Sequence, residues 1–166
     1  EYRLYHRQTR QYVDGSVTYS EGVNDDLNKF VWSAMDLDCD SDLRENVLDY
    51  CRAFFIGADA ERLTDMLIAF EHSWNGDPTD NINIQANFEA FAKMADEQPE
   101  LMNNWRFVLH LFRAYCDKIV RDRRIFELRL IDEAKTLVYL GETEKAIEVL
   151  GTDFCDEYKK NRQKID

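Results

Sequence analysis

Proline and glycine are scarce in this sequence of 166 residues, which contains two prolines and six glycines. Both residue types interrupt helices and mark tight turns, so their scarcity argues against a fold of many short strands. The chain is nevertheless rich in core-forming residues, because 45% of it is hydrophobic and 13% is aromatic. A chain of this length can bury a core of its own, and we expect it to do so with long helices.

Positive charge is also in short supply. The sequence has 21 lysines and arginines against 33 aspartates and glutamates, which gives a formal net charge of -12. Such a surface repels phosphate backbones, so nucleic acid is not an expected partner. No stretch approaches the roughly 18 apolar residues that a membrane span requires, and we expect no membrane insertion.

Signatures of metal, cofactor and nucleophile sites are missing as well. The four cysteines contain no CxxC pair, and the three histidines show no HExxH spacing. The alternating carboxylates Asp36, Asp38, Asp40 and Asp42 resemble a calcium loop, but Ser41 and Val47 occupy the positions that require glycine and a carboxylate. Glycine-rich phosphate loops and the GxSxG element of serine hydrolases are also absent. We therefore expect no metal and no cofactor, buried thiols at Cys51 and Cys116, and a core position for His110.

Helical periodicity dominates what remains. Residues 1–12 predict a first helix, and residues 12–22 predict a loop with a short strand. Further helices are expected to start at Asn24 or Asp25, Ser41, Asp59, Asp80, Pro99, Thr143 and Thr152. The stretch from Pro99 to Leu140 has no interruption and forms either one helix or two that meet near residues 122–124. The fold class predicted is mainly α: an antiparallel helical array preceded by a short loop or strand segment.

Two segments hint at a function. The run LVYLGETEKAIEVL, residues 137–150, is similar to the second half of a tetratricopeptide repeat, a unit that works as a protein-interaction scaffold when several copies stack. The loop Tyr19-Ser20-Glu21-Gly22, followed by Asn24 and Asp25, places a glutamate beside an aromatic residue. That combination suits sugar contact or proton transfer, but glycoside hydrolysis needs two carboxylates and only one clear loop carboxylate is present. A simple helix-entry loop is the alternative.

The same loop opens a longer resemblance. The pattern Y-S-E-G, then D-L-N-K-x-x-W from Asp26, an acidic connector and the run LDYCRAFFIG from Leu48, resembles large bacterial proteins related to glycoside hydrolases. These include α-glucuronidase-like and uncharacterised proteins with a barrel and a helical C-terminal part. The runs AFEHSWNG, from Ala69, and NNWRFVLHLFRAYCDKIVRDR, from Asn103, look like that helical part. The connector lacks the usual prolines and tryptophan and has Leu37 and Cys39 instead.

The resemblance implies a division of the chain. Residues 1–40 would end an upstream (β/α)8-type barrel domain, and residues 41–166 would form a helical C-terminal domain that supports it. Glu21 would lie at the C-terminal face of the barrel and act in catalysis, while Tyr19, Asn24 and Asp25 would bind a carbohydrate. The four residues Trp74, Asn104, Trp105 and Arg106 would be structural or would edge the cleft.

The resemblance also bears on the longer protein. The main catalytic residues would lie upstream, and the location would be periplasmic or extracellular. The chain begins at Glu1 without an initiator methionine, and we interpret it as a piece of a longer polypeptide. Whether that parent is an active enzyme stays open, and the alternative function is a helical, tetratricopeptide-like scaffold without catalytic activity. Alternating strand and helix patterns upstream would favour the barrel, and further helical hairpins would favour the scaffold.

Overall fold

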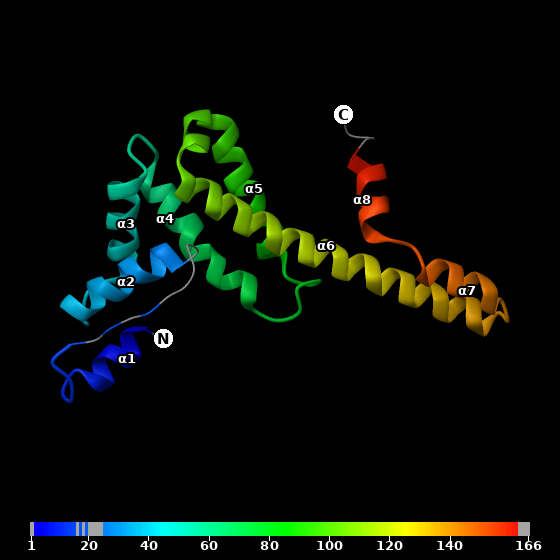
Figure 1. Cartoon of the computed structure of the whole chain (residues 1–166), viewed down its shortest axis with the longest axis horizontal. Coiled ribbons are helices and arrows are strands. Elements are labelled where there is room, and N and C mark those ends of the chain that lie inside the picture. Colours follow the sequence, from blue (N-terminus) through cyan, green and yellow to red (C-terminus); the bar gives the residue numbers. More distant parts are fainter. Residues whose placement is uncertain (1, 16, 18, 20–24, 163–166) are drawn as a thin grey trace.

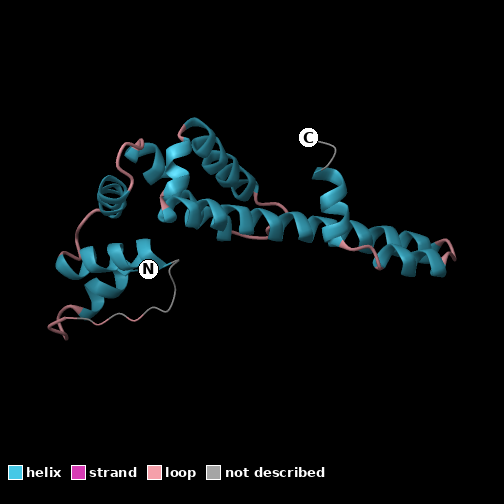
Figure 2. Cartoon of the chain, turned by 45° about the horizontal axis from the view of Figure 1, so that its top comes forward, coloured by secondary structure: helices cyan, strands magenta, loops and turns pink. Residues whose placement is uncertain are grey.

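The chain is mainly helical in the part that the computed structural model describes, which is residues 2–15, 17, 19 and 25–162 (Figures 1 and 2). The α-helices are α1 (Tyr2–Thr9), α2 (Asp26–Leu37), α3 (Leu43–Phe54), α4 (Ala60–Ala69), α5 (Ile82–Glu97), α6 (Trp105–Tyr139), α7 (Thr143–Leu150) and α8 (Phe154–Arg162). Two 3-10 helices, η2 (Phe70–Trp74) and η3 (Pro99–Asn103), precede α5 and α6. These elements confirm the prediction of a mainly α chain. No strand occurs among the described residues, and part of the predicted strand segment, residues 16, 18 and 20–22, lies outside them.

The helix starts follow the expected chemistry, although three of the caps, those of α3, α5 and α8, lie one residue later than predicted. The Asp59 side chain accepts a hydrogen bond from the backbone of Arg62, as a helix cap should. At α3 the cap is Asp42 rather than Ser41, because the Ser41 hydroxyl accepts a bond from Asn46 instead. At α5 the cap is Asn81 rather than Asp80.

Two later starts also differ from the prediction. Thr143 is the first residue of α7, and it follows Glu142 at the cap position, where no side-chain bond is made. The last helix is capped by Asp153 rather than Thr152, because the Asp153 carboxylate accepts bonds from the backbone of Cys155 and Asp156. Local sequence thus places these caps to within one residue, and short-range competition between neighbouring polar side chains decides which residue is the cap.

Helix α6 is one continuous element of 35 residues. At about 1.5 Å per residue it is about 52 Å long. The helix has no break near residues 122–124, so the alternative of two helices that meet there is wrong. Pro99 opens the separate 3-10 helix η3, and α6 begins after Asn104, whose side chain accepts a bond from the backbone of Arg106. The helix ends before Gly141, which adopts a φ of 78° that favours glycine over other residues.

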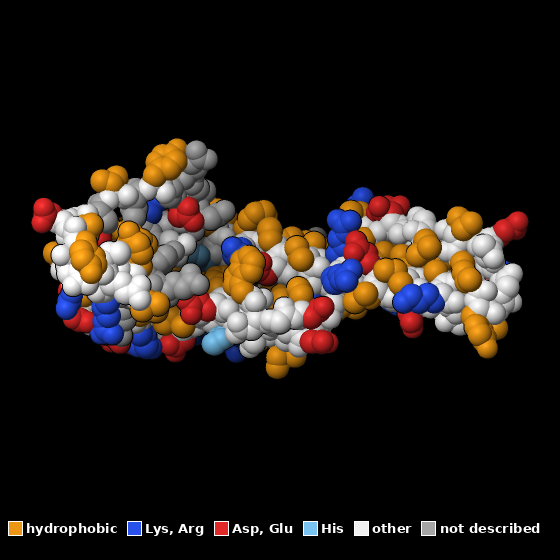
Figure 3. All heavy atoms as spheres, turned by 90° about the horizontal axis from the view of Figure 1, so that it is seen from below, with side chains coloured by type: hydrophobic (Ala, Val, Ile, Leu, Met, Phe, Trp, Pro, Cys, Tyr) orange, Lys and Arg blue, Asp and Glu red, His pale blue; other side chains and the backbone are white. Residues whose placement is uncertain are grey.

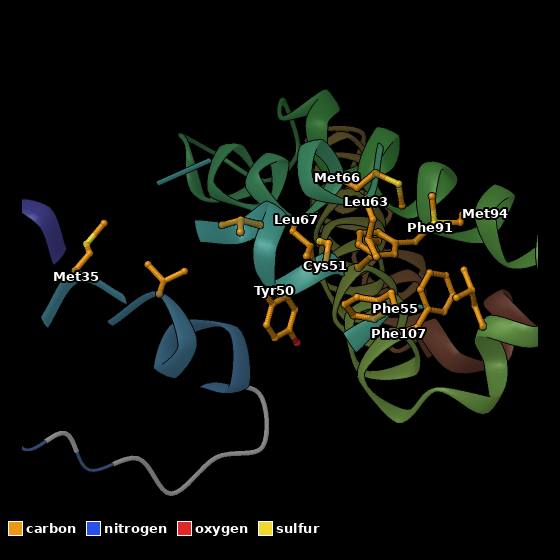
Figure 4. Close-up of a cluster of buried hydrophobic side chains, with 14 residues drawn as sticks. Met35, Tyr50, Cys51, Phe55, Leu63, Met66, Leu67, Phe91, Met94 and Phe107 are labelled. Carbon is orange, nitrogen blue, oxygen red and sulfur yellow. The ribbon is translucent and has the colours of Figure 1, made fainter. Parts of the chain in front are cut away.

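The hydrophobic core lies at one end of the molecule, where α3, α4, α5 and the first half of α6 pack together. Its fully buried members include Tyr50, Phe55, Phe91 and Phe107. Figure 4 shows the labelled side chains of these helices pointing toward one another, with Met35 of α2 lying apart from them. Cys51 is buried in this core as predicted, whereas Cys116 is half-buried.

The second half of α6 projects from this core and carries α7 and α8 (Figure 1). The buried hydrophobic residues here are Phe126, Leu130, Ala134 and Ala146. Other apolar side chains remain exposed on the same helices, including Ile131, Val138, Ile147 and Leu150. Figure 3 shows hydrophobic side chains scattered over this end of the surface. The projecting part is therefore thinly packed.

Helix α1 attaches to the end of α2 through polar contacts. His6 lies 2.7 Å from the carboxylate of Asp36, and Arg7 donates to Asp40 at 2.7 Å. Arg10 donates to the sulfur of buried Cys39 at 2.8 Å. The alternating aspartates thus connect α1 to the array and, through Asp42, cap the next helix.

Candidate functional site

A cleft of about 400 Å³ opens between α2, α3, the α4–η2 segment and α6. Its interior is largely aliphatic, because amphipathic helices from all four sides turn apolar residues toward it. Residues of this interior include Val31, Met35, Val47, Leu67, Ile68 and Leu109. A cavity of this size, with an apolar interior and a few polar groups, is the usual form of a ligand site.

An ionic network centred on Asp26 closes one end of the cleft. Arg106 donates from Nε to Oδ2 of Asp26 at 2.6 Å, and from Nη2 to Oδ1 at 3.3 Å. The Tyr50 hydroxyl donates to the same Oδ2 at 2.8 Å. Asp26 is the first residue of α2, where the helix dipole also favours a negative charge. Burial opposes ionisation, but the bonds from Arg106 and Tyr50 outweigh it and hold the pKa of Asp26 below its usual value.

His110 lies next to this network and is half-buried at the cleft. Its Nε2 is 3.4 Å from the Tyr50 hydroxyl, and rings of Tyr50, Phe55, Phe70 and Phe91 surround it at centroid distances of 6.3–6.4 Å. Burial lowers the pKa of His110 to about 4, although the charge of Asp26 acts in the opposite direction. Burial and the bond to Asp26 raise the pKa of Tyr50. At neutral pH the network therefore holds an ionised Asp26, a neutral His110 and a protonated Tyr50.

These protonation states limit the chemistry of the network. A general acid or base works best when its pKa lies near the working pH. The pKa of His110 and that of Asp26 lie well below neutrality, and that of Tyr50 lies well above it. The arrangement suits holding α2 against α3 and α6, and orienting a polar group at the cleft, better than proton transfer.

Two tryptophan–arginine stacks form the rim of the cleft. The Arg106 guanidinium lies 4.3 Å from the ring centre of Trp105 and 4.0 Å from that of Phe54. Arg113, whose Nε donates to Asp117 at 3.0 Å, lies 4.8 Å from the ring centre of Trp74. Trp74 is 72% exposed and Trp105 49%. Aromatic surface this open at a cleft is available for contact with a ligand or partner.

Three asparagines fix the elements that carry this rim. Asn87 donates to the carbonyl of Ala69 at 3.0 Å and to the Ser73 hydroxyl at 2.8 Å, which ties α5 to the segment bearing Trp74. Asn81 donates to two carbonyls of the same segment. Asn104 donates to the carbonyl of Phe54 at 2.6 Å while it caps α6.

The predicted site residues meet different outcomes. Glu21 and Asn24 lie outside the described residues. Tyr19 is exposed, and Asp25 directly precedes α2 at its cap position, where its side chain makes no capping bond. Of the four residues expected to be structural or to edge a cleft, Trp74, Trp105 and Arg106 line this one, and Asn104 anchors its α6 wall.

Three members of the network were not predicted from sequence. Asp26 and Tyr50 belong to helices recognised by their apolar patterns, and nothing in sequence spacing shows that residues so far apart share a hydrogen bond. His110 was expected in the core because it stands in an apolar run, yet it is half-buried at the cleft. An ionisable residue within an apolar helical run is the one signal that sequence offered.

Comparison with known proteins adds no family: no family model, curated protein or solved structure matches the chain. Within the described ranges there is no group of three or more potential ligands that would hold a metal ion. None of the described helices combines the length and apolarity that crossing a membrane demands.

Proposed function

We propose that this chain is the helical C-terminal part of a carbohydrate-active, glycoside-hydrolase-like protein. One observation supports the proposal above others: the separate sequence segments that carry the resemblance meet at one cleft. Asp26 comes from the D-L-N-K-x-x-W segment, Tyr50 from LDYCRAFFIG, Trp74 from AFEHSWNG and Arg106 from NNWRFVLHLF. Residues that lie far apart in the chain are thus joined by direct bonds or share the walls of one cleft.

In this proposal the helices have a supporting role. The Asp26–Arg106–Tyr50 network fixes the start of α2, and Glu21 precedes Asp26 by five residues in the sequence. Functional groups need support from rigid elements, so a fixed start of α2 suits a glutamate that acts at the edge of a barrel. Tyr19, Asn24 and Asp25 contact the carbohydrate in this arrangement, and the principal catalytic carboxylates lie upstream. The protein acts in the periplasm or outside the cell.

Hydrolysis by the longer parent protein tests the proposal. A panel of chromogenic glycosides and uronides is assayed with the parent and with its Glu21→Gln variant. We expect an active parent and a variant whose rate is lower by about 10²–10⁴, the usual contribution of an acid–base group. An active parent that is indifferent to the change retains the carbohydrate function and moves the chemistry upstream. A parent that hydrolyses no substrate of the panel would favour the second candidate function, an interaction scaffold.

The second candidate is a non-catalytic, tetratricopeptide-like interaction scaffold, and the hairpin of α6 and α7 favours it. This hairpin contains the half-repeat pattern of residues 137–150, and it leaves Val138 and Ile147 exposed at 55% and 68%. Repeat units of this kind bury such faces against the next unit of a stack. The expected occupant is therefore another helical hairpin of a partner protein.

A folded unit of about three stacked consensus tetratricopeptide repeats, added in trans, tests the scaffold function. Docking of the unit should slow amide hydrogen exchange in α7, and Ile147→Glu should abolish that protection. Glu144→Gln, a change of charge on the same helix at an exposed position, serves as the control. Exchange rates in α7 that stay the same with and without the added unit would contradict this candidate.

A further inference from the structure

The cleft has the dimensions of a groove for a helix. It follows α6 from Trp105 to Arg113, which is about 12 Å, or a little over two turns. It follows α2 from Asp26 to Met35, a length of about 13 Å. Amphipathic helices dock in grooves of this kind with apolar side chains at i, i+3 or i+4, and i+7. Between the polar network at one end and the rim, the interior of the groove is aliphatic and suits apolar side chains better than sugar hydroxyls, so a helix ligand goes beyond the proposed carbohydrate function.

The charges around the groove indicate which charge a bound segment should carry. Four charged residues line it, and both arginines already have carboxylate partners: Arg106 is paired with Asp26, and Arg113 with Asp117. Glu71 forms no ion pair with any lysine or arginine among the described residues. Its side chain is exposed at the rim of the groove. The whole chain carries a net charge of -12, which attracts cations over a longer range.

From the groove and these charges we propose that the cleft docks an amphipathic helix of a partner protein, with Leu- or Phe-sized side chains on one face and a lysine or arginine beside them. The apolar face enters between α2 and α6, and the cation pairs with Glu71. The exposed ring of Trp74 then packs against the edge of the helix, and tryptophan is enriched among the residues that contribute most to binding. A second copy of this chain is a poor occupant, because two bodies with a charge of -12 repel each other.

A direct binding measurement tests the proposal with a labelled synthetic peptide. The peptide is a designed helix of about four turns, with leucines at i, i+3, i+4 and i+7 and lysines on the flanks. Its control has glutamates in place of the lysines. We expect the basic peptide to bind at least about tenfold more tightly than the acidic one and to lose affinity as salt is added. Fluorescence of Trp74 and Trp105 should change on binding.

Variants locate the site of binding. Glu71→Gln should weaken binding of the basic peptide about threefold to tenfold, and Glu133→Gln, the same change at another exposed position outside the cleft, should leave its affinity unchanged. Ile68→Trp should block binding by filling the groove. Leu43→Trp, at a lining position that is 37% exposed, does the same with less demand on the fold.

Three results would each overturn the proposal. The first is equal affinity for the basic and acidic peptides. The second is full binding by both groove-filling variants. The third is self-association of the chain without any binding of the basic peptide. None of these results bears on hydrolysis by the longer parent, so the carbohydrate function stands or falls separately.

Discussion

At the scale of single residues, Asp26 has the widest effect on the cleft. It accepts bonds from Arg106 on α6 and Tyr50 on α3, and both of these partners are largely removed from water. Replacing it by asparagine leaves the Arg106 guanidinium without its counter-charge. We expect Asp26→Asn to lower the free energy of unfolding by about 2–3 kcal/mol, the usual cost of losing hydrogen bonds to a charged group.

Urea denaturation of the two proteins checks this value. The matched control is Asp49→Asn, which removes an exposed ion pair with Arg52 on the surface of α3. Exposed pairs contribute little, so the control should stay within about 0.5 kcal/mol of wild type. Equal effects of the two changes would show that the Asp26 network contributes no more than a surface contact.

His110 gives the protein a specific dependence on pH. Its pKa is about 4 when folded and close to 6.5 in an unfolded chain. Between these values the unfolded chain binds a proton at this site that the folded chain does not. Stability therefore falls as pH is lowered from about 6.5 to about 4, by an amount on the order of 3 kcal/mol.

The comparison of wild type with His110→Gln at pH 7 and pH 5 isolates this effect. The variant should lose much of the decrease in urea midpoint between the two pH values, because glutamine does not titrate. His72→Gln, at an exposed position, should keep the wild-type decrease. The lowered pKa of Asp26 acts separately, because its contribution is lost only as pH falls below about 3.8. A His110→Gln variant with an unchanged decrease would refute the assignment.

At the scale of elements, Asn104 joins two helices with one side chain. Its oxygen caps α6, and its amide donates to the carbonyl of Phe54, the last residue of α3. Asn104→Ser keeps a capping oxygen but cannot span to that carbonyl, and we expect a loss of about 1 kcal/mol. Asn104→Ala removes both bonds and should cost about 2 kcal/mol.

Thermal and urea denaturation of the two variants separates the cap from the cross-link. The difference between alanine and serine reports the cap alone. A serine variant as unstable as the alanine variant would mean that the bond to α3 supplies the whole effect. A serine variant as stable as wild type would mean that it supplies none.

Sequence reasoning worked well for these elements, because apolar periodicity and capping residues act over a few positions. It placed most helix starts to within about two residues and predicted a mainly α chain, but it expected a helix from Pro99, where η3 forms, and α6 begins only at Trp105. It failed where distant groups compete. Nothing in the local sequence distinguishes Asp26 from Asp25. Only Asp26 pairs with Arg106, and that pairing depends on how α6 packs against α2. The local sequence likewise does not show that His110 lines the cleft, because the cleft exists only through the packing of α2 relative to α6.

At the scale of the whole molecule, stability is expected to differ between the two ends. One end contains the core around Phe91 and Phe107, whereas the buried hydrophobic residues at the projecting end are few: Phe126, Leu130, Ala134 and Ala146. Hydrogen exchange should be fast in α7 and in the last four turns of α6, and slow in α5 and the first four turns. Mass spectrometry of peptides from the two halves of α6 provides the measurement. Uniform protection along the helix would contradict the difference in packing.

Because α6 is continuous, a movement at one end of the helix is transmitted to the other end. One end of this rod forms a wall of the cleft, and the other end carries α7 and α8, with no break between them. A tilt of about 5° at the cleft would displace the far end of a rod about 52 Å long by about 4–5 Å. A small adjustment around a bound helix is thereby amplified into a movement at the opposite end, and a distance measured between labels at the two ends would follow what occupies the cleft.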